Sequence, residues 1–135
     1  MIDSNFKNGC VLIVGGSGGI GSLCAQEFAS SGAKVAITYY KNEQAAINIA
    51  NDIDSGVQIY QLDNSDPQSV AETFKKVAKD HGSINTLVNA AGFDIPQKFI
   101  SEIDIDLWKG VIDADINGFF NLVKSGLPYL RESQG

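Results

Sequence analysis

Short apolar runs alternate along the chain with longer segments in which apolar residues recur every three or four positions. The runs are typical of buried parallel strands and lie at residues 10–14, 34–39, 57–62 and 84–88. The periodic segments predict amphipathic helices, and the expected buried stripe of the first consists of Ile20, Leu23, Cys24 and Phe28. A last, longer helix is expected from about Asp104 to about Leu127, with Pro128 in or just after its last turn, because proline disfavours a helix interior.

Residues at the ends of these segments support the predicted boundaries. Asn42 and Asp66 are typical helix N-caps, and Pro67 suits the first helical position. Gly32 and Gly82 suit the ends of the first and third helices, where a left-handed backbone is common.

The alternation of strands and helices predicts an α/β fold with a parallel sheet. Right-handed crossovers give the strand order 3-2-1-4, with the first two helices on one face and the later two on the other. The loops after strands one and four then open on the same crevice, where such sheets bind ligands. We expect a Rossmann-type doubly wound sheet with two helices per face, built as one domain because no linker or repeat interrupts residues 1–135.

A glycine-rich loop at residues 15–21 joins the first strand to the first helix. Such a loop lets the backbone approach a ligand closely, and the free N–H groups of the helix start attract a phosphate. The glycines fit both G-x-G-x-x-G and G-x-x-x-G-x-G, whereas the Gly-Lys-Ser/Thr ending of a nucleotide-hydrolysing P-loop is missing. A methyltransferase-like nucleotide site stays open as an alternative.

The end of the second strand favours one nucleotide over another. It reads Thr38-Tyr39-Tyr40-Lys41-Asn42, with no carboxylate before Glu43. An acid there would hold ribose hydroxyls in NAD enzymes and in methyltransferases, and would repel a 2′-phosphate. We therefore expect NADP(H) rather than NAD(H), with Thr38 and Lys41 as candidate contacts; the alternative for Lys41 is a solvated loop lysine.

Four segments together resemble the short-chain dehydrogenase/reductase family, and among its members the 3-oxoacyl-carrier-protein reductases. Val14 to Gly21 is similar to the family's T-G-x-x-x-G-I-G, and Asn89-Ala90-Ala91-Gly92 to its N-N-A-G. Leu62-Asp63 resembles its adenine-binding acidic position, and Asp115 to Gly118 its catalytic asparagine segment. Val14 and Ala90 depart from the family pattern, and each loses a side chain that would brace the site, at a cost of about 1 kcal/mol per hydrogen bond.

The resemblance implies hydride transfer between a nicotinamide dinucleotide and a small carbonyl or alcohol substrate. It implies a catalytic role for Asn117, which would anchor a water in a proton relay. With the contacts inferred above, the expected cofactor-binding residues are Gly15, Ser17, Gly19, Ile20, Gly21, Thr38, Lys41, Asp63, Asn89, Ala90, Ala91 and Gly92.

The family's serine and Tyr-x-x-x-Lys, which supply the proton, have no counterpart here, since no tyrosine is followed four residues later by lysine. We therefore expect residues 1–135 to be the N-terminal part of a longer dinucleotide-binding domain, with the fifth strand of that domain lying beyond these residues. The alternative is an inactive nucleotide-binding fragment. The fourth strand would be an open edge and Trp108, Phe119 and Phe120 would be exposed, so we expect marginal stability and self-association, most simply as a homo-oligomer.

Composition excludes other classes of function. The net charge of 10 − 16 = −6 disfavours binding to nucleic acid or to an anionic membrane. Cys10 and Cys24 have no metal-ligand or redox-motif spacing, so we expect no metal site and two reduced thiols. With no export signal at the N-terminus and no membrane-length apolar run, a cytoplasmic location is expected.

Overall fold

The computed structural model describes residues 9–53 and 56–135. The prediction that the N-terminus holds no export signal concerns residues outside this described part. Four parallel strands form one sheet in the order β3-β2-β1-β4, which confirms the predicted topology. The strands are β1 (Cys10–Val14), β2 (Lys34–Tyr39), β3 (Gln58–Gln61) and β4 (Ile84–Asn89). β3 and β4 are the edges of this sheet.

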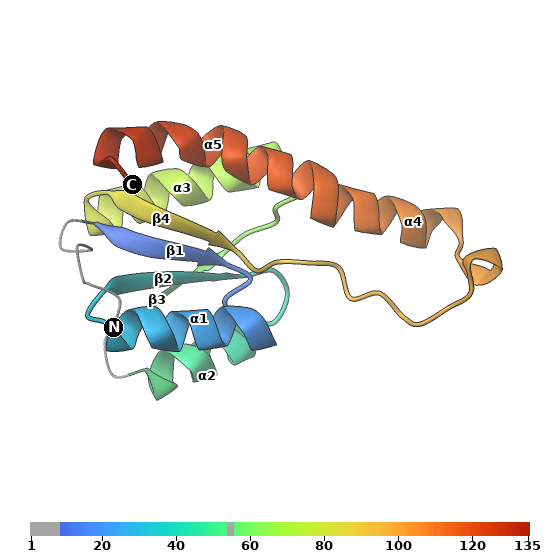
Figure 1. The fold of residues 1–135 in the computed structure, drawn as a ribbon, viewed down its shortest axis with the longest axis horizontal. Helices are drawn as coiled ribbons and strands as arrows, with labels where there is room; N and C mark the ends of the chain where they lie inside the picture. Colours follow the sequence, from blue (N-terminus) through green and yellow to red (C-terminus); the bar gives the residue numbers. More distant parts are fainter. Residues whose placement is uncertain (1–8, 54–55) are drawn as a thin grey trace.

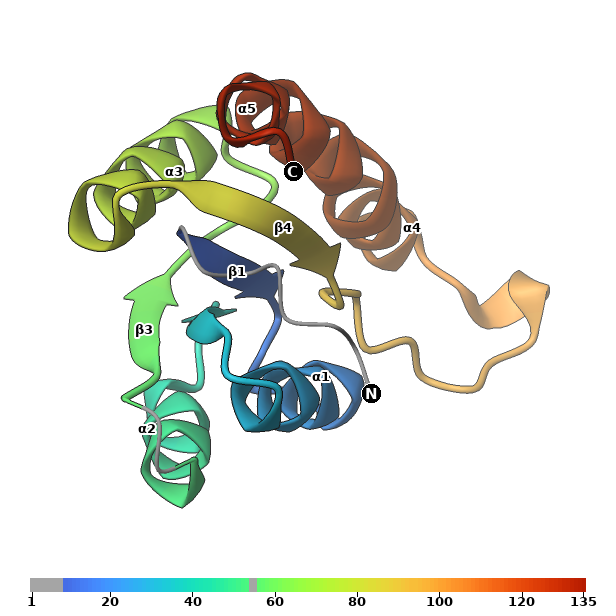
Figure 2. The same cartoon turned by 60° about the vertical axis from the view of Figure 1, so that its left-hand side comes forward.

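Two helices cover each face of the sheet, as the crossovers predict (Figure 2). α1 (Gly19–Ser30) and α2 (Glu43–Asp52) lie on one face, and α3 (Pro67–His81) and α5 (Gly118–Ser133) on the other. α4 (Ile105–Val111) continues the line of α5 beyond the sheet, and the chain between β4 and α4 projects with it (Figure 1). That connection holds one short 3₁₀ turn, η1 (Ile100–Glu102). Within the described residues, no helix has the length and apolar character needed to cross a membrane.

The core has two halves because β1 is buried on both faces. Successive side chains of a strand point to opposite sides, so Leu12 packs in the cluster of Phe74 and Leu122, and Ile13 in that of Ala25 and Ala46. All five side chains of β1 are buried. A strand that is apolar at every position is thus explained by helices on both sides.

The predicted caps are confirmed. Asn42 Oδ1 accepts a hydrogen bond of 3.0 Å from the backbone N–H of Ala45 at the start of α2. Asp66 Oδ1 accepts one of 3.0 Å from Gln68 N–H at the start of α3. Gly82 follows α3 with φ of 85°, the left-handed region that favours glycine.

The predicted buried stripe of α1 is wrong in part. Ile20 and Leu23 are 75% and 63% exposed, and the fully buried positions of the helix are Gly21 and Ala25. Cys24 and Phe28 are partly buried against the same cluster. Small residues let the helix start lie close to the glycine loop, and this contact turns the larger residues outward.

The predicted last helix is wrong in its end and in its regularity. The helical chain begins where expected, with Asp104 as the N-cap of α4, but it passes through a π-helical segment, η2 (Ile112–Asn117), and continues to Ser133. Pro128 lies inside α5. A proline leaves free the carbonyl four residues earlier, here that of exposed Lys124, where water can hydrate it.

Candidate functional site

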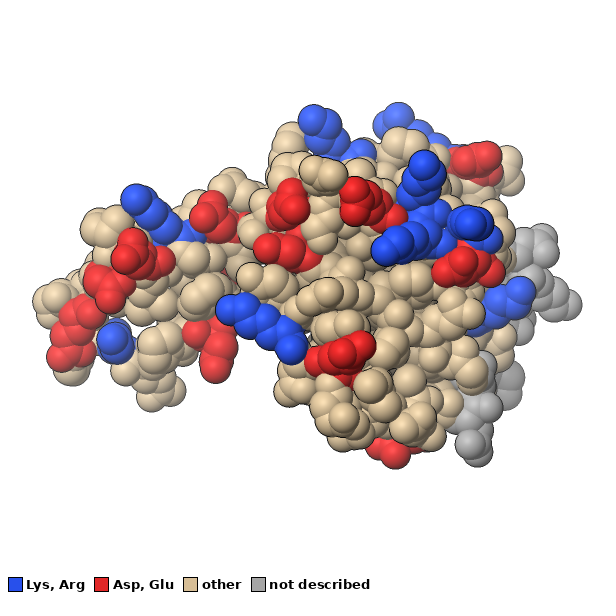
Figure 3. Space-filling view, turned by 180° about the vertical axis from the view of Figure 1, so that it is seen from behind, with Lys and Arg blue, Asp and Glu red and all other residues tan. Residues whose placement is uncertain are grey.

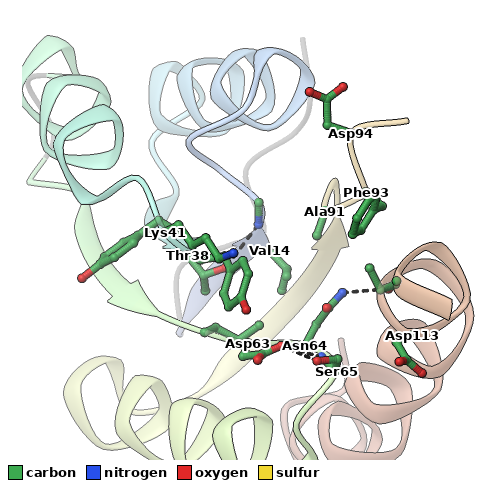
Figure 4. Close-up of a pocket in the computed structure, with 17 residues that line it drawn as sticks. Val14, Thr38, Lys41, Asp63, Asn64, Ser65, Ala91, Phe93, Asp94 and Asp113 are labelled. Atoms are coloured by element: carbon green, nitrogen blue, oxygen red, sulfur yellow. Dashed lines mark hydrogen bonds between the residues drawn. The ribbon is translucent and has the colours of Figure 1, made fainter. Parts of the chain in front are cut away.

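A cavity of about 520 Å³ opens at the carboxyl ends of all four strands. Figure 4 shows its walls converging from the ends of the strands on one side and from the helical segment around Asp113 on the other. Its lining comprises Val14, Gly15, Thr38 to Lys41, Leu62 to Ser65, Ala91 to Asp94, Gly110, Asp113 and Ala114. The predicted convergence of the loops after β1 and β4 is therefore present.

The contact between these two loops is made by backbone. Gly15 has φ of 76°, and a Cβ atom there would lie 2.7 Å from Ala91 N and 2.9 Å from the Ala90 carbonyl carbon. Ala90 N–H donates a hydrogen bond of 2.9 Å to Val14 O. Only glycine fits at position 15, since both its conformation and the space around it exclude a side chain.

The other glycines divide into packed and open positions. A Cβ at Gly21 would lie 2.3 Å from Gly15 O, and one at Gly16 would lie 2.5 Å from Ile37 Cβ. A Cβ at Gly19 would meet nothing within 4 Å. The N-cap Gly18 offers no side-chain hydrogen bond, and the first turn of α1 holds no acid. The start of this 12-residue helix is thus uncapped and accessible, which fits a bound phosphate.

The two candidate residues at the end of β2 lie differently. Thr38 is 1% exposed, and its Oγ1 accepts a hydrogen bond of 3.2 Å from Gly15 N–H. Its hydroxyl therefore braces the glycine loop from below. Lys41 is exposed at the cavity, with its Nζ 5.0 Å from the centre of the Tyr40 ring. Of the two, Lys41 carries the charge that a phosphate would meet.

Asp63 and Asn89 organise their own turns. Asp63 Oδ1 accepts hydrogen bonds from Ser65 N–H at 3.0 Å and from Ser65 Oγ at 2.6 Å, and Asp63 also lines the cavity. Asn89 Oδ1 accepts one of 3.2 Å from Ala91 N–H. Both residues thus shape the loops that form the cavity wall.

Asn117 lies at the end of the π-helical segment and is exposed. Its Nδ2 donates a hydrogen bond of 2.8 Å to Asp113 Oδ1, and Asp113 lines the cavity. Asp115 Oδ1 accepts one of 2.9 Å from Phe93 N–H, so the same segment is tied to the chain after β4. π-helical turns are rare and are often found at functional sites.

Six of the predicted residues line the cavity: Gly15, Thr38, Lys41, Asp63, Ala91 and Gly92. The others lie outside its lining and are Ser17, Gly19, Ile20, Gly21, Asn89, Ala90 and Asn117. Sequence reasoning missed Asn64, Asp94 and Asp113 as parts of the wall. In the run from Asp63 to Asp66, the sequence indicates an adenine contact for Asp63 and a helix cap for Asp66 but no role for Asn64, and nothing in the sequence marks a π-helical insertion.

A second group of titratable side chains lies by the C-terminal end of α3. Tyr60 Oη donates a hydrogen bond of 2.9 Å to Asp80 Oδ2, and burial together with this carboxylate raises the pKa of Tyr60. Burial also raises the pKa of the Cys10 thiol to about 12 and lowers the pKa of His81. Among the described residues, no three His, Cys, Asp or Glu side chains are placed to hold a metal ion.

Comparison with known proteins bears on the same residues. The family described as short chain dehydrogenase matches residues 9–135. An acetoacetyl-CoA reductase of Shinella zoogloeoides is 34% identical over 111 residues, which cover 82% of this chain and 45% of that protein. An uncharacterised oxidoreductase of Staphylococcus epidermidis is 28% identical over 130 residues, covering 96% of this chain and 56% of the relative.

Solved structures share the fold. A short chain dehydrogenase from Burkholderia cenocepacia in complex with NADP is 27% identical, with a TM-score of 0.83 over 90% of this chain and 51% of that one. The ligand-free aldohexose dehydrogenase of Thermoplasma acidophilum is 26% identical, with a TM-score of 0.80, and the match covers 96% of this chain and 47% of that one. The chain spans about half the length of the curated relatives it matches. By its fold, its loop geometry and the match over residues 9–135, this chain belongs to the short-chain dehydrogenase/reductase family of oxidoreductases.

Proposed function

We propose that this chain is the nucleotide-binding part of an enzyme that transfers hydride between NADP(H) and a carbonyl or alcohol substrate. The observation that carries the proposal is the close contact of Gly15 with Ala91. This contact joins two loops beside a cavity that is lined by residues at the carboxyl ends of all four strands. A dinucleotide needs such an extended site, with a phosphate cradle beside a groove.

The residues present fit the cofactor. The N–H groups at the start of α1, around Gly19 and Ile20, would hold the pyrophosphate, and Asp63 would meet the adenine. When bound, the nicotinamide supplies or accepts the hydride. Asn117 would lie on the side of the reacting ring, where it is hydrogen-bonded to Asp113 and able to orient a water.

The preference for NADP(H) rests on charge at the end of β2. Lys41 is exposed at the cavity, and no carboxylate lies between Thr38 and Asn42. The three acids in the cavity lining belong to other elements and are Asp63, Asp94 and Asp113. A 2′-phosphate beside Lys41 would gain a charge-assisted hydrogen bond that NAD(H) lacks.

For the substrate, the support is chemical resemblance. A similar protein is named as an acetoacetyl-CoA reductase, and acetoacetyl-CoA is a 3-oxoacyl thioester. We propose a small carbonyl compound for the whole enzyme. The 135-residue chain by itself is proposed to be inactive, since it contains no Tyr-x-x-x-Lys to supply the proton. An inactive nucleotide-binding fragment is the second candidate, because residues 1–135 contain no Tyr-x-x-x-Lys.

Self-association is part of the proposal. Trp108, Phe119 and Phe120 are 57%, 53% and 61% exposed along α4 and α5. Figure 3 shows acidic groups prominent on the projecting part and basic groups gathered toward the other end of the molecule. A second copy would cover the apolar residues with opposite charges facing each other. The two free thiols, Cys10 and Cys24, support a cytoplasmic location.

The proposed function is tested by titrating the chain with NADPH and NADH and following nicotinamide fluorescence. We expect tighter binding of NADPH, and a loss of preference in Lys41→Ala of about tenfold, equivalent to one phosphate contact. Lys98→Ala removes the same charge outside the cavity lining and serves as the matched control. Binding of neither nucleotide would refute the proposal, and a preference for NADPH in Lys41→Ala that is as strong as in the unaltered chain would remove Lys41 from the site. Consumption of NADPH with a carbonyl substrate by this chain alone would contradict its proposed inactivity.

A further inference from the structure

Asn64 connects three elements around the cavity, although it occupies an ordinary turn position after β3. Its Nδ2 donates a hydrogen bond of 3.0 Å to the carbonyl oxygen of Ala114, 50 residues later in the chain. Its own carbonyl oxygen accepts one of 2.9 Å from Asn121 Nδ2, a buried amide in α5. Figure 4 shows the Asn64 side chain pointing across the cavity to the helical segment. We propose that Asn64 is a positioning residue that holds the π-helical segment and couples it to the nucleotide end of the cavity.

The acceptor of this hydrogen bond explains why the residue matters. Ala114 lies inside the π-helical segment Ile112–Asn117, where the regular i to i−4 pairing is interrupted. The Asn64 amide gives the Ala114 carbonyl oxygen a hydrogen-bond donor from outside the helix, so the turn after β3 is tied directly to this segment. Asp113 and Asn117, joined to each other by a hydrogen bond, belong to the same six residues. The hydrogen bond from Asn64 to Ala114 therefore also restrains the backbone that carries the Asp113 and Asn117 side chains.

The fit between Asn64 and the helix is close. A Cβ at Gly118, the first residue of α5, would lie 2.5 Å from Asn64 Nδ2 and 2.6 Å from its Cγ. Gly118 is buried and lies directly after the π-helical segment. A residue that merely formed a turn would require neither this space nor a donor directed at Ala114. The Asn64 amide is instead fixed between Ala114 and Gly118, where it supports the helix.

The turn that carries Asn64 also reaches the other end of the cavity. Asp63 precedes it and holds Ser65 through two hydrogen bonds, and all three residues line the cavity. If the adenine contacts Asp63, as the proposed function has it, the nucleotide restrains the same short turn that supports Ala114. Occupation of the adenine end would then steady the segment that carries Asn117. This coupling rests on the proposed function, whereas the support of the segment by Asn64 does not.

The support is tested without ligand, by amide hydrogen exchange of the 135-residue chain. In Asn64→Ala, we expect exchange within residues 112–117 to rise by about tenfold, as expected for loss of one local hydrogen bond, while β1 amides keep their rates. Gly118→Ala forces the Asn64 amide aside without changing Asn64, and the same local rise is expected although alanine favours a helix. Gly118→Ala also decides the matter if Asn64→Ala does not fold. Asn48→Ala removes an exposed amide on α2 and is the control.

The coupling is tested with 2′,5′-ADP, which represents only the adenine half of the cofactor. Protection of residues 112–117 is expected to rise on binding to the unaltered chain and to stay unchanged in Asn64→Ala, with 2′,5′-ADP still bound. Unchanged exchange at 112–117 in both ligand-free variants would overturn the support, as would an equal rise in Asn48→Ala. Binding without added protection in the unaltered chain would overturn the coupling. Absence of any nucleotide binding would refute the proposed function and the coupling with it, while the ligand-free comparison still decides the support.

Discussion

The backbone N–H of Gly15 donates a hydrogen bond of 3.2 Å to Oγ1 of Thr38, 23 residues away on the neighbouring strand. Thr38 is buried, so this hydroxyl is shielded from water. The hydrogen bond fixes the first residue of the glycine loop against the end of β2, and the loop is thereby shaped before any ligand arrives.

Thr38→Val should therefore loosen the loop. Valine keeps the shape and leaves the Gly15 N–H without its partner, which costs about 1–3 kcal/mol in free energy of unfolding. Thr38→Ser retains a hydroxyl and should lose less. Urea denaturation followed by circular dichroism measures both values, and equal stability of Thr38→Val and the unaltered chain would show that the hydrogen bond contributes nothing.

Alanine substitutions in the glycine loop should separate folding from binding. Gly21→Ala places a Cβ atom 2.3 Å from Gly15 O and is expected to destabilise the fold by about 1–3 kcal/mol, in the range of overpacked cores. Gly19→Ala meets no atom within 4 Å, so its free energy of unfolding should be unchanged or higher. The same Gly19→Ala protein should bind NADPH more weakly, because its methyl group enters the space left for the phosphates. Destabilisation by Gly19→Ala, or unimpaired binding, would contradict this division.

Stability should fall in mild acid because of His81. Burial lowers its pKa from the ordinary value of 6.5, so the folded state binds the proton less readily than the unfolded chain. The contribution is fully present above pH 6.5 and is lost as the pH falls from 6.5 toward the lower folded pKa. His81→Gln should flatten this part of the profile of urea midpoints between pH 8 and pH 5. An identical slope in His81→Gln would assign the acid sensitivity to the carboxylates instead.

The two thiols should differ in reactivity. Cys10 is 2% exposed and its pKa is raised to about 12 by burial, so it forms almost no thiolate at neutral pH. Cys24 is partly exposed on α1. In the folded protein, a disulfide reagent such as Ellman's should modify one thiol per chain rapidly, and Cys24→Ser should abolish this fast phase. A fast phase that survives in Cys24→Ser would show that Cys10 is accessible.

Removal of apolar side chains from α4 and α5 should reduce self-association. Combining Trp108→Ala with Phe120→Ala deletes two exposed aromatic side chains and should shift sedimentation velocity profiles toward the monomer. Leu23→Ala removes a similarly exposed apolar group, 63% accessible, from the opposite face of the sheet and is the matched control. A concentration-independent monomer in the unaltered chain would refute the proposed association.

Much of the fold was predictable because it depends on local signals. Asn42, Asp66 and Gly82 mark helix ends through interactions with their immediate neighbours, and the four apolar runs identify strands that are buried on both faces. The strand order follows from the handedness of crossovers. The glycine loop and the Asn89–Gly92 segment could be placed in one crevice for the same reason.

The errors arose where distant parts of the chain decide the outcome. Apolar spacing alone predicted that Ile20 and Leu23 are buried, but the contact of Gly21 with the loop sets the rotation of α1. Pro128 indicated a helix end, yet the packing of α5 on the sheet carries the helix past it. The role of Asn64 was not predicted, because its hydrogen-bond partner Ala114 lies 50 residues away. An asparagine in a turn and an alanine in a helix give no sign that they contact each other.

The continuous helical rod of α4 and α5 also limits how the length of the chain can vary. A regular helix turns by about 100° for each residue, so a single insertion or deletion between Trp108 and Ile112 would rotate the preceding side chains of α4 by that angle relative to those of α5. Aromatic residues such as Trp108 would then project in a new direction, although the helical rod would change in length by only about 1.5 Å. The chain before η1, at residues 93–99, has no helical repeat to disturb. Changes in length should therefore be tolerated in that stretch and not within residues 109–111, in the regular part of α4.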